Sequence, residues 1–182
     1  MDEILRAELL AMERLDRDTR AELVKRGKLH AGGYHPQMQA VHTRHNARMR
    51  AILETYGWPG RSLVGDDGCR AAGFVVQHAI LDADLQRRGV ELLSAAVAQQ
   101  EAEPFMLALL TDRVLMQEGH AQIYGTQYVG DAHGGVEPWP IANPETVDQR
   151  RLAFGLPPLA ENTLRLNAQQ RQEMSKMHTP EE

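Results

Sequence analysis

The sequence predicts a mainly α-helical protein, an irregular bundle of about six or seven helices with one small β-hairpin. Apolar residues recur at three- and four-residue spacing over most of the chain, as on the buried face of a helix. Prolines and glycines stand where those segments begin and end. Only residues 123 to 141 have the residue alternation and the glycine-rich turn of a hairpin.

The first half of the chain predicts two long helical segments. One or two helices cover residues 3–26 and end at Gly27, with an apolar stripe formed by Leu5, Leu9, Met12 and Leu15. After the connector KLHAGGYHP, Pro36 begins a helix that runs to Gly57. Its predicted stripe consists of Met38, Val41, His45, Met49, Ile52 and Tyr56.

Three further helices are predicted before the hairpin. The glycines and prolines of residues 57–67 indicate a loop, in which Asp66 or Asp67 can cap a helix over residues 68–81. Asp82 is placed to cap the next helix, which reaches about residue 101. Pro104 begins another helix, which stops at Gly119.

The last third of the chain contains the hairpin and two more helices. The strands are IYGTQYV and VEPWPI, on either side of the turn GDAHGG. Asn143 and Pro144 restart the helical pattern as cap and first residue, up to about Gly155, and Pro157 opens a final amphipathic helix. We expect a single domain over residues 1–182, with a frayed tail from about residue 174.

Composition and charge narrow the class of protein. Hydrophobic residues make up 42% of the 182 residues and charged residues 25%, which is typical of a globular domain. The net charge of −5 argues against a nucleic-acid partner or an anionic membrane surface. We expect a cytoplasmic protein for three reasons. The chain has a single cysteine, Cys69, and it shows neither a signal-peptide pattern nor an apolar run of membrane-spanning length. Nothing in the sequence specifies its oligomeric state.

Polar residues interrupt apolar stripes at several points. His78 shares a helix face with Ala71, Phe74 and Val75, and Gln77 lies beside it. A buried imidazole without partners costs a few kcal/mol, so we expect His78 to be mostly buried and hydrogen-bonded to another element. Further polar groups come from a pair on the second helix, a pair within an apolar run, and the hairpin: His42 and Asn46; Asp112 and Arg113; Gln122, Tyr124, Thr126 and Gln127.

These polar groups favour a small-molecule site. Convergent polar side chains in an apolar cavity are typical of such sites, although a structural network between the helices and the hairpin would use the same residues. A strand would place Gln122, Tyr124 and Thr126 on one face, and we expect that face to cover the pocket around His78.

An ordered set of short motifs resembles a bacterial family of domains of unknown function. The resemblance covers about residues 35–165 and leaves out the first 30 residues and the end of the chain. It implies which residues define the family's pattern but no mechanism, because the family has no established activity. The motifs are GWP at 57–59, VG at 64–65, QHA at 77–79, Gln86, DR at 112–113, QIYGTQ at 122–127, PI at 140–141, VD at 147–148, RR at 150–151 and GLPPL at 155–159.

The leading hypothesis is an enzyme that acts on a small organic substrate by acid and base chemistry, as a hydrolase, cyclase or isomerase, without a metal or other cofactor. An imidazole ordinarily titrates near neutral pH, so His78 is the predicted proton-transfer residue. Asp112 would orient it or act as the base, and the Arg113 guanidinium would bind a carboxylate or an oxyanion. Tyr124 completes the catalytic set. The predicted substrate-binding residues are His42, Asn46, Trp58, Gln77, Gln122, Thr126 and Gln127.

Two other classes of function stay open. A metal-dependent enzyme would use His42, His45 and His78, since histidines and carboxylates three or four residues apart can share a helix face, as His78 and Asp82 can. A non-catalytic ligand-binding or interaction domain would use the same side chains. Cys69 is a weak candidate nucleophile, because no base accompanies it in the sequence.

Overall fold

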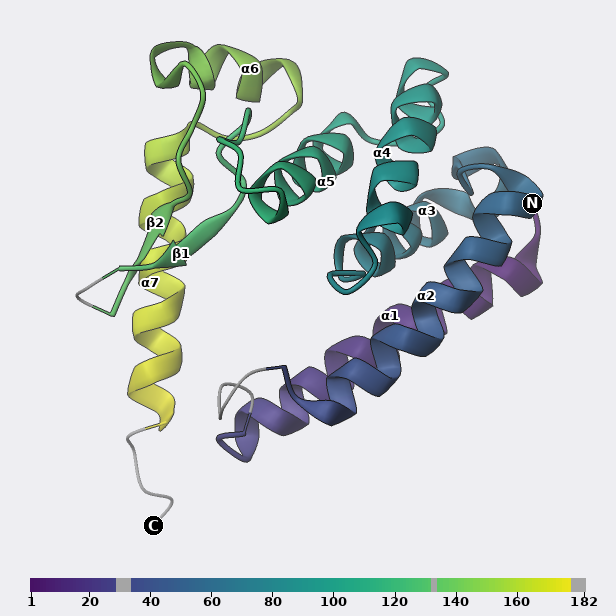
Figure 1. The fold of residues 1–182 in the computed structure, drawn as a ribbon, viewed down its shortest axis with the longest axis horizontal. Coiled ribbons are helices and arrows are strands. Elements are labelled where there is room, and N and C mark those ends of the chain that lie inside the picture. Colours follow the sequence, from purple (N-terminus) through teal and green to yellow (C-terminus); the bar gives the residue numbers. More distant parts are fainter. Residues whose placement is uncertain (29–33, 132–133, 178–182) are drawn as a thin grey trace. The chain divides into compact units, whose positions relative to one another are not determined.

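The structure is a computed structural model that describes residues 1–28, 34–131 and 134–177. Its described part is mainly α-helical with one two-stranded hairpin, which confirms the predicted fold class (Figure 1). The chain forms two compact units, Met1–Leu110 and a second that begins at Thr111. Among the described residues, no helix is both long enough and apolar enough to cross a membrane.

The first unit contains four helices and the first half of a fifth: α1 (Glu3–Lys25), α2 (Pro36–Tyr56), α3 (Arg61–Gln77), α4 (Ala83–Ala98) and α5 (Pro104–Gln117). Helices α1 and α2 lie side by side, and α3 packs against both (Figure 1). Several predicted boundaries are confirmed. Pro36 is the first residue of α2, and Asp82 caps α4 by accepting a hydrogen bond from the Leu85 amide at 3.1 Å.

Helix α3 differs from the prediction at both ends. It begins at Arg61, inside the predicted loop, and is interrupted at Gly65, whose φ of +74° is a conformation that favours glycine. Directly after this break, the Asp67 carboxylate accepts from the Gly68 amide at 2.8 Å. The helix ends at Gln77, so His78 is its C-cap and not a residue of its interior.

The buried stripe of α1 carries a carboxylate into the core. Its buried residues are Leu5, Leu9, Met12, Asp16, Thr19 and Leu23. The predicted stripe is confirmed as far as Met12 but is wrong at Leu15, which is 39% exposed. On α2 the structure likewise exposes Tyr56 and buries Leu53 in its place.

The second unit contains the hairpin and the last helices: β1 (Tyr128–Gly130), β2 (Val136–Pro138), the 3₁₀ helix η1 (Pro144–Thr146), α6 (Val147–Ala153) and α7 (Leu159–Met177). The strands pair antiparallel with Val129 opposite Glu137. They are shorter than predicted, because residues 123–127 form no strand. Asn143 precedes η1 in a left-handed conformation and makes no side-chain cap.

Three predicted features lie partly or wholly outside the described residues. They are the connector at residues 29–33, the hairpin turn at residues 132–133 and the tail at residues 178–182. The described part of the predicted tail continues helix α7 to Met177.

Candidate functional site

A buried carboxylate that is hydrogen-bonded to two imidazoles is the central feature of the first unit. Asp16 of α1 is 1% exposed. Its Oδ2 lies 2.5 Å from Nε2 of His42 on α2, and both of its oxygens lie 3.1 Å from Nδ1 of His78 at the end of α3. The Tyr34 hydroxyl is hydrogen-bonded to the other nitrogen of His42. We call these four residues, Asp16, Tyr34, His42 and His78, the Asp16 cluster.

Hydrogen bonding keeps the Asp16 carboxylate ionised. Burial opposes ionisation, but the hydrogen bonds from His42 and His78 outweigh it and hold the pKa of Asp16 well below its usual range. Burial, together with the nearby Asp16 charge, raises the pKa of Tyr34 to about 12, so its hydroxyl keeps its proton. The cluster therefore contains one fixed negative charge and a neutral phenol at neutral pH.

The ionised carboxylate fixes which nitrogens carry protons. An ionised carboxylate only accepts hydrogen bonds, so Nε2 of His42 and Nδ1 of His78 must both donate to it. In a neutral His42 ring, Nδ1 then accepts a hydrogen bond from the Tyr34 hydroxyl. In a neutral His78 ring, Nε2 carries the lone pair, and this atom has no hydrogen-bond partner among the described residues.

Of Asp16, His42 and His78, His78 is the residue most exposed to solvent. Its side chain is 29% exposed, against 8% for His42 and 1% for Asp16, so it is more open than the sequence predicted. Its hydrogen bond to another helix is as expected, although the partner is Asp16. The Gln86 side-chain amide of α4 holds the end of α3 in place by donating to the carbonyls of Val76 and Gln77, each at 3.1 Å.

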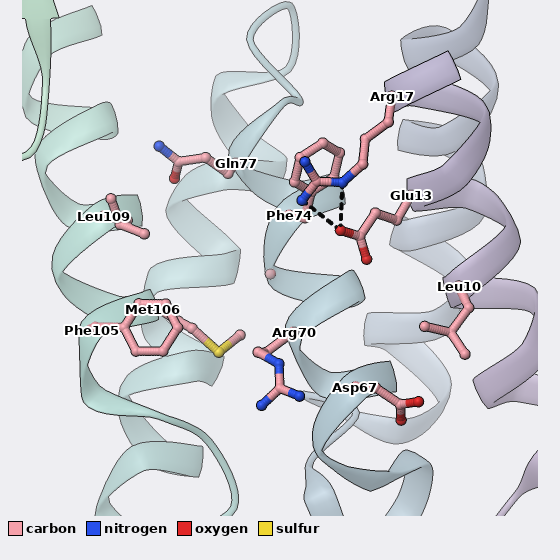
Figure 2. Close-up of a pocket in the computed structure, with 11 residues that line it drawn as sticks. Leu10, Glu13, Arg17, Asp67, Arg70, Phe74, Gln77, Phe105, Met106 and Leu109 are labelled. Atoms are coloured by element: carbon pink, nitrogen blue, oxygen red, sulfur yellow. Dashed lines mark hydrogen bonds and ion pairs between the residues drawn. The ribbon is translucent and has the colours of Figure 1, made fainter. Parts of the chain in front are cut away.

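A pocket of about 410 Å³ lies beside this cluster, between α1, α3 and α5 (Figure 2). The Phe74 ring belongs to both features, because it lines the pocket and contacts the His78 ring at 4.1 Å between centroids. Arg17 lies over the same phenyl ring at 4.3 Å and pairs with Glu13. The pocket is lined by Leu10, Glu13, Arg17, Asp67, Arg70, Gly73, Phe74, Gln77, Phe105, Met106 and Leu109.

Four polar side chains of the first unit outside the Asp16 cluster have buried atoms without hydrogen-bond partners among the described residues. The atoms are Nδ1 of His45, Oδ1 of Asn46, Oε1 of Gln77 and Oε1 of Gln86. Burial lowers the pKa of His45, which favours its neutral form. Gln77 is the member of this group that lines the pocket, where a bound hydrogen-bond donor would satisfy its oxygen.

In the second unit, Asp112 is the centre of a separate network. Its carboxylate is 0% exposed and accepts from the backbone amides of Ile123, Tyr124 and Thr126 and from the Thr126 hydroxyl, at 2.7 to 3.1 Å. These bonds fold residues 122–127 into a loop around the carboxylate, which is why the predicted strand is absent. The sequence predicted that Asp112 orients His78 or acts as the base, but in the structure both of its oxygens accept hydrogen bonds from this loop.

Arginine and glutamine side chains complete the loop's hydrogen bonds. Arg151 is 1% exposed and donates to the carbonyls of Tyr124, Gly125 and Pro157. Arg150 donates to the carbonyls of Ile123, Ala142 and Asn143 and to the Thr146 hydroxyl. Gln122 accepts from the Gln127 amide and donates to the carbonyls of Gln127 and Trp139. The QIYGTQ and RR motifs thus meet in one network that holds this loop.

Three further predicted site residues, Trp58, Tyr124 and Arg113, lie outside the Asp16 cluster. Trp58 lies in the apolar core and donates to the Cys69 thiol at 3.4 Å, and burial raises the pKa of that thiol. The Tyr124 ring packs on Phe154 at 4.5 Å, and burial raises the pKa of Tyr124. Nε of Arg113 is buried without a hydrogen-bond partner among the described residues, and burial lowers its pKa. The predicted meeting of Arg113 and the hairpin with His78 stays a prediction.

Sequence reasoning missed Asp16, the centre of the cluster, and Tyr34. A signal for Asp16 was present, because it follows Met12 by four residues and precedes Thr19 and Leu23 at helical spacing. An acidic residue in an apolar stripe is as informative as a histidine there. Tyr34 lies outside every predicted helix and had no such signal.

The fold and this site define a mainly α-helical protein with a buried carboxylate and histidine cluster. A family model described as a family of unknown function, DUF6624, matches residues 3–171, and the chain belongs to that family. The match corrects the predicted limits of about 35–165, because it includes α1 and therefore Asp16. No curated protein and no solved structure matches the chain.

Proposed function

We propose that the protein is an enzyme that transfers protons to and from a small organic substrate, with Nε2 of His78 as the atom that moves the proton. The observation that supports this most directly is the pairing of the buried Asp16 carboxylate with Nδ1 of His78, while Nε2 has no partner among the described residues. A carboxylate that holds one imidazole nitrogen as a donor leaves the other as a base, and it stabilises the imidazolium formed when that base takes a proton. His42 donates a further hydrogen bond to the carboxylate and is itself hydrogen-bonded to the Tyr34 hydroxyl, so both act as positioning residues.

The tautomer of His78 tests the assignment without a known substrate. We expect ¹⁵N NMR at pH 8 to show protonated Nδ1 and unprotonated Nε2 for His78, because Asp16 can only accept. Asp16→Asn removes the negative charge and should reduce this preference. The opposite tautomer in the wild-type protein would contradict the proposal.

The proposal is also tested by assaying the protein on a panel of esters, lactones and enolisable carbonyl acids. Hydrolysis and deuterium uptake from D₂O are the two measurements of turnover. We expect His78→Gln to reduce the rate on any substrate that the wild type turns over by about 10²-fold or more, as is usual for loss of a general base. His120→Gln is the matched control, because His120 is an exposed histidine of the second unit. Equal rates for the wild type and His78→Gln would assign the chemistry to other residues.

One observation favours a second candidate, a metal-dependent enzyme. One ligand atom from each of Asp16, His42 and His78 lies within 4.8 Å of the other two, and two histidines with one carboxylate form a common set for divalent transition metals. The hydrogen bond of Tyr34 to the second nitrogen of His42 would then orient that ligand. His45, the third histidine of the sequence-based metal hypothesis, is not a member of this group.

Metal titration separates the two candidates. If His78 acts as a free base, adding Zn²⁺ or Mn²⁺ to chelator-treated protein should raise the thermal midpoint of the wild type no more than it raises that of His42→Gln. A ligand raises stability only by binding the folded state. Binding of one equivalent that is lost in both His42→Gln and His78→Gln would favour the metal-dependent candidate.

A further inference from the structure

The pocket beside the Asp16 cluster has an apolar body with charges at its rim. Leu10, Phe74, Phe105, Met106 and Leu109 supply carbon surface from three helices. Figure 2 shows Phe105 and Met106 on α5 opposite Leu10 on α1, with Phe74 and Arg70 on α3 between them. A cavity of about 410 Å³ with this lining is of the size and kind that bind small organic molecules.

Among the charged side chains that line the pocket, one arginine has no ion-pair partner among the described residues. Glu13 pairs with Arg17 at 2.7 Å, and Asp67 accepts two hydrogen bonds from Arg6 at 2.6 and 2.8 Å. Arg70 also lines the pocket and has no ion-pair partner among the described residues. A guanidinium binds a carboxylate through two parallel hydrogen bonds. The nearby carboxylates of Glu13 and Asp67 disfavour a dianion such as a phosphate monoester.

Three pocket-lining residues of α3 lie on one face of the helix. Arg70, Phe74 and Gln77 are four and three residues apart, so they follow one another on a single helix face over about 10 Å. Oε1 of Gln77, at the far end of this face, is buried without a partner among the described residues. An unsatisfied buried acceptor is unfavourable, and a hydroxyl or amide N–H of a bound molecule would satisfy it.

We propose that this pocket binds an amphipathic monocarboxylate with its carboxylate on Arg70, its apolar body on Phe74 and Met106, and a hydrogen-bond donor near Gln77. This names a substrate class for the enzyme and rests on the proposed function for turnover, although binding is measurable by itself. Phe74 links the two, because the ring that covers the apolar body also contacts His78.

The probe is 4-(4-hydroxyphenyl)butanoate, compared with its neutral analogue 4-(4-hydroxyphenyl)butan-1-ol. Binding is followed by calorimetry and by NMR of ¹³C-methyl methionine, in which the Met106 methyl reports on the pocket and the buried Met49 methyl serves as reference. We expect the acid to shift the Met106 signal selectively and to bind about tenfold more tightly than the alcohol, equivalent to about 1.4 kcal/mol.

Arg70→Gln should abolish the preference for the acid while leaving the affinity for the alcohol unchanged. Arg14→Gln removes a charge from an exposed arginine that does not line the pocket, and it should preserve the preference. Equal affinity for acid and alcohol in the wild type, or no shift of Met106 at millimolar acid, would overturn the proposal. His78→Gln should bind the acid normally, so loss of turnover with retained binding concerns the catalytic role alone.

Discussion

Asp112→Ala is expected to unfold the loop of residues 122–127 and to lower the free energy of unfolding of the second unit by about 4 kcal/mol, because it removes the acceptor of four partly buried donors, and a donor that is buried without a partner costs about 1–3 kcal/mol. Three backbone amides and the Thr126 hydroxyl lose their partner together. Asp112→Asn keeps one acceptor oxygen, so its loss should be intermediate.

The two tryptophans allow each unit to be followed by itself. Trp139 lies in the second unit, where its indole donates to the His120 carbonyl, and Trp58 lies in the core of the first. Urea unfolding of Asp112 variants is therefore measured by Trp139 fluorescence in a Trp58→Phe background. Glu137→Ala, an exposed acid of β2, is the control and should change stability by less than about 0.5 kcal/mol. A similarly small effect for Asp112→Ala would show that the loop does not depend on this carboxylate.

Asp16→Ala should lower the free energy of unfolding of the first unit by about 3 kcal/mol or more, as removal of one partner from a buried charged network usually does. The imidazole N–H groups of His42 and His78 lose their common acceptor, and His42 is nearly inaccessible to replacement water. Trp58 fluorescence in a Trp139→Phe background reports this unit. Asp18→Ala, on the exposed side of the same helix, is the matched control and should have little effect.

The pH dependence of this stability has a definite sign. Because the folded-state pKa of Asp16 lies below its ordinary value of 3.8, the folded protein holds fewer protons than the unfolded chain as the pH falls below that value. The stabilisation by Asp16 is complete above about pH 5 and is lost on further acidification. The difference in stability between the wild type and Asp16→Asn should therefore narrow below about pH 4, by up to about 1.4 kcal/mol per pH unit. A constant difference from pH 5 to pH 3 would exclude this contribution.

Helix boundaries were predictable because their causes are local. Pro36 at the first position of α2 and Asp82 as the cap of α4 act on backbone groups within one turn. The start of α3 was predicted wrongly, at residue 68 instead of Arg61, since a glycine and neighbouring acidic residues are equally compatible with a loop and with a helix that is interrupted at one residue. Periodicity also identified His42 and His78 as polar residues on partly buried faces, and in the structure each is hydrogen-bonded to Asp16 of α1.

The sequence by itself determined the helical class, the hairpin and the unusual polar residues on apolar faces, since these follow from spacing along the chain. Only the tertiary structure decided which polar groups are partners. Asp16 is hydrogen-bonded to His78, 62 positions away in the sequence, whereas Asp112, the carboxylate predicted to act with His78, accepts from backbone amides 11 to 14 residues away. Hydrogen bonds select partners by distance and direction in space, and the packing of α1 against α2 and α3 sets both for Asp16.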